Sequence, residues 1–111
     1  MAKADRLERL DTRRVELEAE YRDALVAALQ KAAAGAWGLF DHQADRRTRE
    51  KIAPVIDALN EMGEAIDEMR EQLGLEAFAL HQEFLGSRGP VASSAVGEPK
   101  QARAWLDRLG I

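Results

Sequence analysis

The sequence contains no cysteine, which excludes disulfide bonds, thiolate zinc sites and cysteine nucleophiles. It has no apolar run approaching about 18 residues, so we expect no membrane-spanning helix. Residues 1–6 lack the apolar stretch of a signal peptide, and we therefore expect a cytoplasmic protein. Aromatic residues make up only 5% of the chain, and the net charge of −4 argues against non-specific binding to phosphate backbones.

The length and composition of the chain predict one soluble domain. It has 111 residues, of which 46% are apolar and 32% charged. Residues 4–34 contain neither proline nor glycine, and most of their larger apolar side chains recur at spacings of three and four. This pattern predicts an amphipathic helix, and Gly35 is placed to end it. The bias toward arginine over lysine and the many alanines favour a bacterial origin.

A second helix is predicted by seven consecutive apolar heptad positions. The pattern is typical of one side of a packed bundle or of a coiled-coil seam, and its short length favours the bundle. Either this helix begins near Asp45 and continues through Pro54 with a kink, or a new helix begins with Pro54 in its first turn. The unbroken pattern favours the kinked helix. The seven positions are Ile52, Val55, Leu59, Met62, Ile66, Met69 and Leu73.

A shorter helix is expected after Gly74, which is placed to end the second helix. It would cover about residues 76–85. We expect it to bury Phe78 and Leu85, with His81 as a further candidate.

The last part of the chain changes composition. Residues 86–98 are rich in glycine and serine and contain a proline, which is the composition of a flexible linker. We therefore divide the chain into a helical hairpin or bundle domain over 1–85, a linker over 86–98 and a short amphipathic C-terminal helix over 99–111. That helix carries Ala102, Trp105, Leu106 and Leu109 on one side.

The lengths of these helices point to oligomerisation. Helices of roughly 30 residues are about 45 Å long, whereas a compact globule of this size is about 35 Å across. Pairing two hairpins would cover apolar stripes that a single hairpin leaves exposed. The predicted fold is all-α: a long antiparallel helical hairpin with two short C-terminal helices, which completes a bundle by dimerisation. Opposite charges favour the antiparallel order, with Arg6, Arg9, Arg13 and Arg14 expected beside Glu64, Asp67, Glu68 and Glu71.

An apolar stretch occupies the predicted hairpin turn, where polar residues are usual. Residues 35–43 read Gly-Ala-Trp-Gly-Leu-Phe-Asp-His-Gln. Trp37, Leu39 and Phe40 either fold back over the open end of the bundle or form a recognition patch, since tryptophan is typical of binding hot spots. The segment resembles the Trp-Gly-Leu-Phe turn of uncharacterised small bacterial helical proteins. That resemblance covers about residues 20–45 and implies no catalytic activity.

Three acidic residues, Glu61, Glu64 and Asp67, follow one another at a spacing of one helical turn, as in helical Mg²⁺ sites. The spacing is similar to that of the all-α nucleoside triphosphate pyrophosphohydrolases, which bind Mg²⁺ with Glu-Glu-x-x-Glu on one helix and Glu-x-x-Asp on the next. Here Asn60 replaces the first glutamate, and the separate Glu-x-x-Asp at 20–23 lies on the earlier helix. The heptad places Glu61 and Glu64 toward water, which favours a solvated face over a metal site.

Other catalytic chemistry has little support. His42 and His81 are isolated from each other, and neither belongs to a pair at helical spacing. The serines of the linker have no histidine beside them, and the chain has no nucleophile elbow, phosphate-binding loop or dinucleotide fingerprint. Residues 46–51 form one basic cluster that could bind phosphates, but the acidic net charge and the lack of a helix-turn-helix pattern argue for a solvated face.

These observations favour a small cytoplasmic homodimer whose role is association rather than catalysis, without a cofactor. Two alternatives stay open: a divalent-metal hydrolase using the acidic stripe of the second helix, and a nucleic-acid-associated regulator using residues 46–51. We expect any protein partner to bind through the apolar turn or the C-terminal helix. The partner-binding candidates are Trp37, Leu39, Phe40, Trp105, Leu106 and Leu109.

Overall fold

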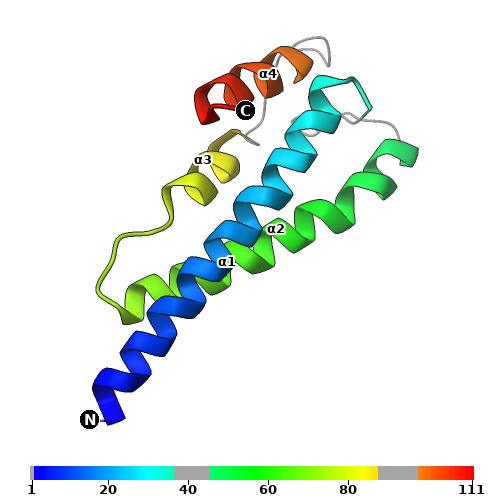
Figure 1. The fold of residues 1–111 in the computed structure, drawn as a ribbon. Helices are drawn as coiled ribbons and strands as arrows, with labels where there is room; N and C mark the ends of the chain where they lie inside the picture. The colour runs from blue at the N-terminus through cyan, green and yellow to red at the C-terminus, as the bar shows by residue number, and fades with distance from the viewer. Residues whose placement is uncertain (1, 37–45, 88–97) are drawn as a thin grey trace.

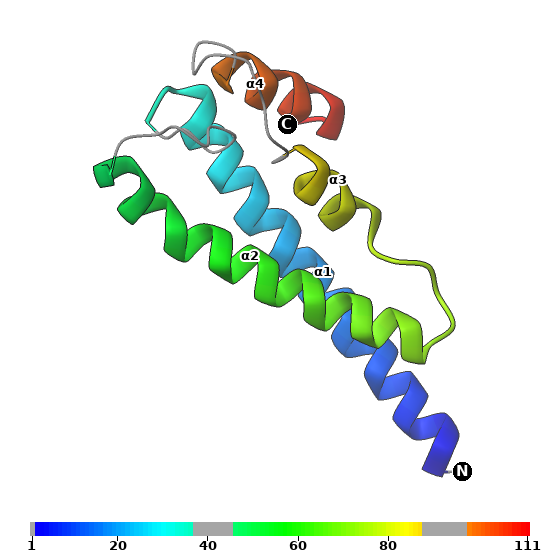
Figure 2. The same ribbon diagram turned by 180° about the vertical axis from the view of Figure 1, so that it is seen from behind.

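The computed structural model describes residues 2–36, 46–87 and 98–111, and all regular secondary structure in these ranges is helical. The all-α class predicted from the sequence is therefore confirmed. Figures 1 and 2 show α1 and α2 running in opposite directions, with α4 lying across the C-terminal end of α1. The helices are α1 (Ala2–Ala33), α2 (Arg46–Gln72), α3 (Ala79–Ser87) and α4 (Glu98–Leu109).

Glycines end the two long helices where the sequence predicts. Gly35 has a φ of 78°, and the next residue donates its backbone N–H to the carbonyl oxygen of Lys31 at 2.9 Å. Gly74 has a φ of 73°, and the following N–H reaches the carbonyl oxygen of Arg70 at 2.7 Å. Glycine takes this left-handed conformation without the steric cost that a side chain adds. Pro54 lies inside α2, so the prediction of one helix running through the proline is also confirmed.

One apolar core joins all four helices. α1 supplies its longest stripe, in steps of three and four, because every third or fourth residue of a helix faces the same side. Three residues of α4 belong to the same core, so the C-terminal helix packs on α1 of its own chain. The buried apolar residues are Leu17, Tyr21, Leu25, Ala28, Leu29 and Ala32 of α1, Ile52, Ile56, Leu59 and Ile66 of α2, Phe84 of α3, and Ala102, Trp105 and Leu106 of α4.

The buried face of α2 is rotated from the predicted heptad. Ile52, Leu59 and Ile66 are buried as expected, but between them the buried positions are Ile56 and Gly63. The predicted positions 55, 62, 69 and 73 are only partly buried. The rotation arises because α3 packs against the side of α2 that carries Gly63.

The short helix α3 also differs from the prediction. It begins at Ala79 rather than near residue 76, and Leu85, which we expected in the core, is 47% exposed. Phe84 is buried in its place, and His81 is buried beside it. The choice between neighbouring residues of so short a helix depends on its rotation against α1 and α2, which its own sequence does not determine.

An arginine of each helix, α1 and α4, binds the C-terminal end of the other. Arg103 of α4 donates to the carbonyl oxygen of Ala33 at 3.1 Å, and Arg22 of α1 donates to the carbonyl oxygen of Leu109 at 3.1 Å. The last carbonyls of a helix have no partner within the helix, and cationic donors interact favourably with that end. Each helix therefore caps the other.

The prediction of which charged residues pair between α1 and α2 is wrong. Glu18 of α1 accepts from Arg70 of α2 at 2.8 Å and from Arg14 of its own helix at 2.7 Å. Arg13 pairs within α1, with Glu16 at 3.7 Å. Among the described residues, no ion pair joins the first arginines of α1 to the acidic residues of α2.

The molecule is elongated. Its radius of gyration is 15.9 Å, whereas about 13 Å is expected for a compact chain of this length. The first turns of α1 extend past the end of α2, as Figures 1 and 2 both show. We call residues 4–13 the N-terminal arm. Leu7, on this arm, is 40% exposed.

Candidate functional site

A buried polar contact joins α3 to α1. The hydroxyl of Tyr21 on α1 lies 2.8 Å from Nδ1 of His81 on α3, and the two side chains are 0% and 2% exposed. Burial lowers the pKa of His81, which favours the neutral ring, and Nδ1 of a neutral imidazole can accept the phenol proton. Burial raises the pKa of Tyr21 above its ordinary value, so the phenol also stays neutral. The phenol hydroxyl and Nδ1 of the imidazole are thus hydrogen-bonded to each other within the core.

Gly63 makes room for this histidine. A Cβ at position 63 would overlap with Cδ2, Nε2 and Cε1 of the His81 ring, so the imidazole occupies the space of the missing side chain. Our sequence reading did not predict this contact, although a glycine inside a strong helix indicates a close approach by another element. His81 is therefore placed by three helices and does not face a ligand.

Asp67 also has a structural partner. Its carboxylate accepts the backbone N–H of Phe78 at 2.8 Å and the side-chain amide of Gln82 at 3.1 Å. A carboxylate at the start of a helix satisfies a donor that has no partner within that helix. Asp67 belongs to α2, and its carboxylate therefore caps the start of α3.

The other metal candidates, Glu61 and Glu64, are exposed on α2, as the heptad predicts. In the part of the chain that the structure describes, no group of three or more histidine or acidic side chains could hold a metal ion. The alternative of a metal-dependent hydrolase therefore gains no support from the geometry.

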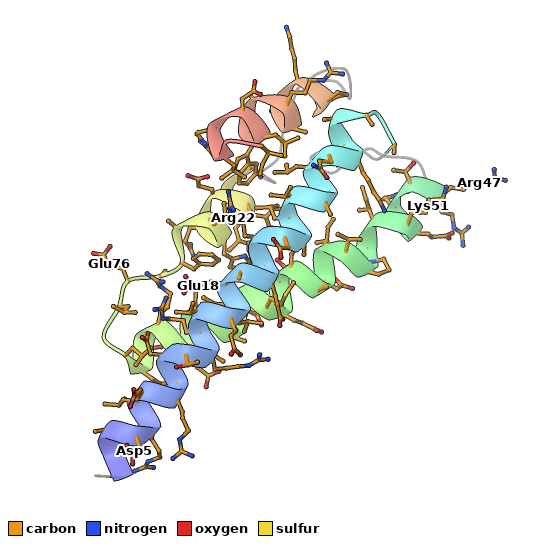
Figure 3. All side chains as sticks on the ribbon, viewed as in Figure 1. Asp5, Glu18, Arg22, Arg47, Lys51 and Glu76 are labelled. Atoms are coloured by element: carbon orange, nitrogen blue, oxygen red, sulfur yellow. The ribbon has the colours of Figure 1, made fainter. Side chains whose placement is uncertain are left out.

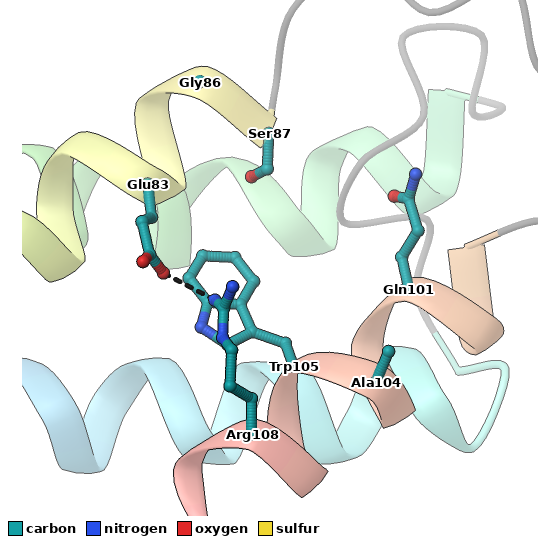
Figure 4. Close-up of a pocket in the computed structure, with 7 residues that line it drawn as sticks. All are labelled: Glu83, Gly86, Ser87, Gln101, Ala104, Trp105 and Arg108. Atoms are coloured by element: carbon teal, nitrogen blue, oxygen red, sulfur yellow. Dashed lines mark hydrogen bonds and ion pairs between the residues drawn. The ribbon is translucent and has the colours of Figure 1, made fainter.

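An open pocket lies between α3 and α4, and it is a candidate binding site (Figure 4). Its volume is about 570 Å³, within the range of small-molecule sites. The guanidinium of Arg108 lies 5.6 Å from the ring centre of Trp105 and pairs with Glu83 of α3 at 2.6 Å. Ser87 donates to the carbonyl oxygen of Phe84 at 2.8 Å. The remaining lining residues are Gly86, Gln101 and Ala104.

This pocket has the groups of a binding surface rather than those of a catalytic centre. The Glu83–Arg108 pair is largely exposed, and surface pairs contribute about 0–1 kcal/mol, so a ligand could displace it at low cost. The hydroxyl of Ser87 is engaged by a helix carbonyl, and no histidine lines the pocket among the described residues. No nucleophile and base stand side by side there.

The residues predicted to bind a partner fall into two groups. Trp105 and Leu106 are buried against α1, and Leu109 is partly buried. Trp37, Leu39 and Phe40 lie outside the described residues, as do His42 and positions 88–97 of the predicted linker. Partner binding through the first group would use the face of Trp105 that borders the pocket, or would require α4 to leave α1.

The basic cluster at the start of α2 is a solvated face. Figure 3 shows Arg47 and Lys51 pointing away from the other helices, and Arg46 pairs with Glu50 of the same helix at 3.3 Å. The first turn of α2 carries no acidic residue, although the positive end of a helix favours one.

Comparison with models of protein families, with curated proteins and with solved structures finds no match for this chain. The resemblance of residues 20–45 to a Trp-Gly-Leu-Phe turn therefore stays a prediction. Among the described residues, no helix combines the length and the apolar character needed to cross a membrane.

Acidification is expected to destabilise the protein through His81. Burial lowers its pKa below the ordinary value of 6.5, although the charges of Asp67 and Glu64 oppose this shift. The unfolded chain therefore binds the proton more tightly than the folded chain. The contribution of the neutral His81 to the free energy of unfolding is therefore complete above pH 6.5. It is lost as the pH falls from 6.5 toward the pKa of the folded state.

Urea unfolding at about pH 7.5 and about pH 5 would measure this loss. His81→Gln, which cannot titrate, should lose less stability between the two values than the wild type. His42→Gln removes the other imidazole of the chain and shows how far the pH dependence is specific to His81. An equal loss in all three proteins would assign the pH dependence to other groups.

Proposed function

We propose that the protein is a homo-oligomeric interaction module without catalysis, in which two antiparallel helical hairpins complete a bundle by dimerisation. The observation that carries this proposal is the length of α1. Its N-terminal arm extends past α2 and carries an exposed leucine, and the radius of gyration exceeds that of a compact monomer of this length. An apolar helix stripe without a cover favours association. The lack of cysteine fits the cytoplasm as its compartment.

Light scattering behind a sizing column tests the proposal. At micromolar concentration we expect a mass about twice the 12.3 kDa of one chain. A protein that stays at the mass of one chain at millimolar concentration, with its helicity intact, would contradict the proposal.

A further inference from the structure

The apolar stripe of α1 continues into the N-terminal arm without a partner. Leu7 and Leu10 precede Leu17 and Tyr21 on the same side of the helix, because successive members are three, seven and four residues apart. Leu17 and Tyr21 are buried, but Leu7 is 40% exposed. Leu75, which follows the end of α2, is 42% exposed. One end of the molecule thus presents apolar side chains from two elements.

In the described part of the chain, the same end carries a basic and an acidic set of side chains that form no ion pair with each other, although Arg13 pairs with Glu16 of its own helix. Arg6, Arg9 and Arg13 follow one another at steps of three and four, so they form a basic edge beside the apolar stripe. The end of α2 and the residues after it carry three exposed glutamates. Among the described residues no ion pair joins the two sets. The glutamates are Glu68, Glu71 and Glu76.

We propose that two copies of the chain associate by antiparallel overlap of their N-terminal arms, each basic edge lying on the acidic end of the other copy's α2. This inference rests on the proposed function and names its surface. The partner is a second copy because the surface is self-complementary: apolar arm meets apolar arm, and each basic edge meets an acidic end. A two-fold axis makes every such contact twice.

The spacing of the elements fits an overlap centred on Leu10. The end of α2 lies beside α1 near Glu18, since Arg70 contacts that carboxylate at 2.8 Å. An arm of ten residues is about 15 Å long, so its tip reaches the corresponding region of the second copy. Leu7 of one chain then approaches Leu75 of the other, and the basic edge approaches the glutamates.

The surface suits a small interface. The arm and the segment 67–76 comprise 20 residues, and only those on the side that faces the second copy can contact it. The interface is therefore smaller than the 20–30 residues a side of a standard one, which is typical of a weak or transient contact.

Charge reversal with rescue tests the proposed contact by sedimentation. The variant Arg6→Glu/Arg9→Glu should weaken the dimer at least about tenfold, and so should Glu68→Arg/Glu71→Arg, because each places like charges together twice. Combining all four changes should restore the wild-type Kd within about threefold. Dissociation should also increase with salt, since the pairs are exposed. The matched control is Arg47→Glu/Arg49→Glu at the other end of α2, which should leave the Kd unchanged.

Cysteine cross-linking tests the direction of the overlap, because the chain has no cysteine of its own. Leu10→Cys should form a disulfide with itself, since it lies at the proposed two-fold axis. A mixture of Leu7→Cys and Leu75→Cys chains should also cross-link, whereas Leu7→Cys alone should not, because the two copies of residue 7 would lie about 9 Å apart along the axis.

The outcomes separate this inference from the proposed function. If the wild type is a dimer but the charge-reversed variants have the same Kd, the antiparallel arm contact is overturned and the oligomeric module stays in place. The same holds if chains with Leu7→Cys alone cross-link with one another. A wild-type monomer overturns both. Circular dichroism of each variant shows whether helicity is retained, so that a loss of association is not a loss of folding.

Discussion

Replacing Gly63 with alanine is expected to destabilise the protein by about 3 kcal/mol, although in an exposed helix the same change stabilises by about 1 kcal/mol. The reason is steric. The new Cβ would overlap with three atoms of the His81 imidazole, which is buried between α1 and α2 and cannot move aside without breaking its bond to Tyr21. Urea unfolding followed by circular dichroism measures the change.

Gly86→Ala is the matched control. Gly86 also lies in a helix, but a Cβ there meets nothing within 4 Å, so the change should be neutral or stabilise by up to about 1 kcal/mol. Gly63→Ala should recover part of its loss when combined with His81→Ala, which removes the ring. If Gly63→Ala behaves like Gly86→Ala, the packing of α3 on α2 is not as described.

Trp105→Ala is expected to lower the free energy of unfolding by about 3–5 kcal/mol. The indole is 7% exposed and packs with Ala102 and Leu106 of α4 in the core that α1 lines. Removing a buried aromatic side chain loses its transfer free energy and leaves a cavity. Gln101→Ala, on the exposed side of the same helix, should change stability by less than about 0.5 kcal/mol.

The result for Trp105 also decides between two roles of the C-terminal helix. A large loss shows that α4 is part of the folded core. An unchanged stability, with Trp105 as accessible to a quencher as free tryptophan, would instead make the indole available to a partner, for which the sequence makes Trp105 a candidate.

The sequence predicts the long helices well because their signals are local. Each long helix has helix-forming residues, an apolar stripe at spacings of three and four, and a glycine just after its C-terminal end. All three signals lie within or next to the helix that they predict. The exposure of Glu61 and Glu64 follows from the same periodicity. The rotation of α2 was missed because it depends on which residue of another helix approaches Gly63.

The site was less predictable than the helices. Tyr21 and His81 are 60 residues apart, and nothing in the sequence around either residue indicates the other. Asp67 appeared as one carboxylate in an acidic stripe, yet its role depends on a backbone N–H of a segment 11 residues further on. The pocket at Trp105 requires two short helices to be placed on α1, and a short helix has little structure of its own.

The mutual capping of α1 and α4 has a consequence for the order in which the protein can fold during synthesis. The hydrogen bonds that join these helices connect residues 70 and 87 positions apart, so α1 receives part of its packing from a helix that is synthesised later. Until α4 emerges, α1 lacks part of the cover that it has in the native core. A small helical bundle usually folds rapidly through neighbouring contacts, whereas this chain must close a loop over most of its length. We expect a ribosome-bound chain that lacks α4 to remain sensitive to protease, and the released chain that includes α4 to become resistant.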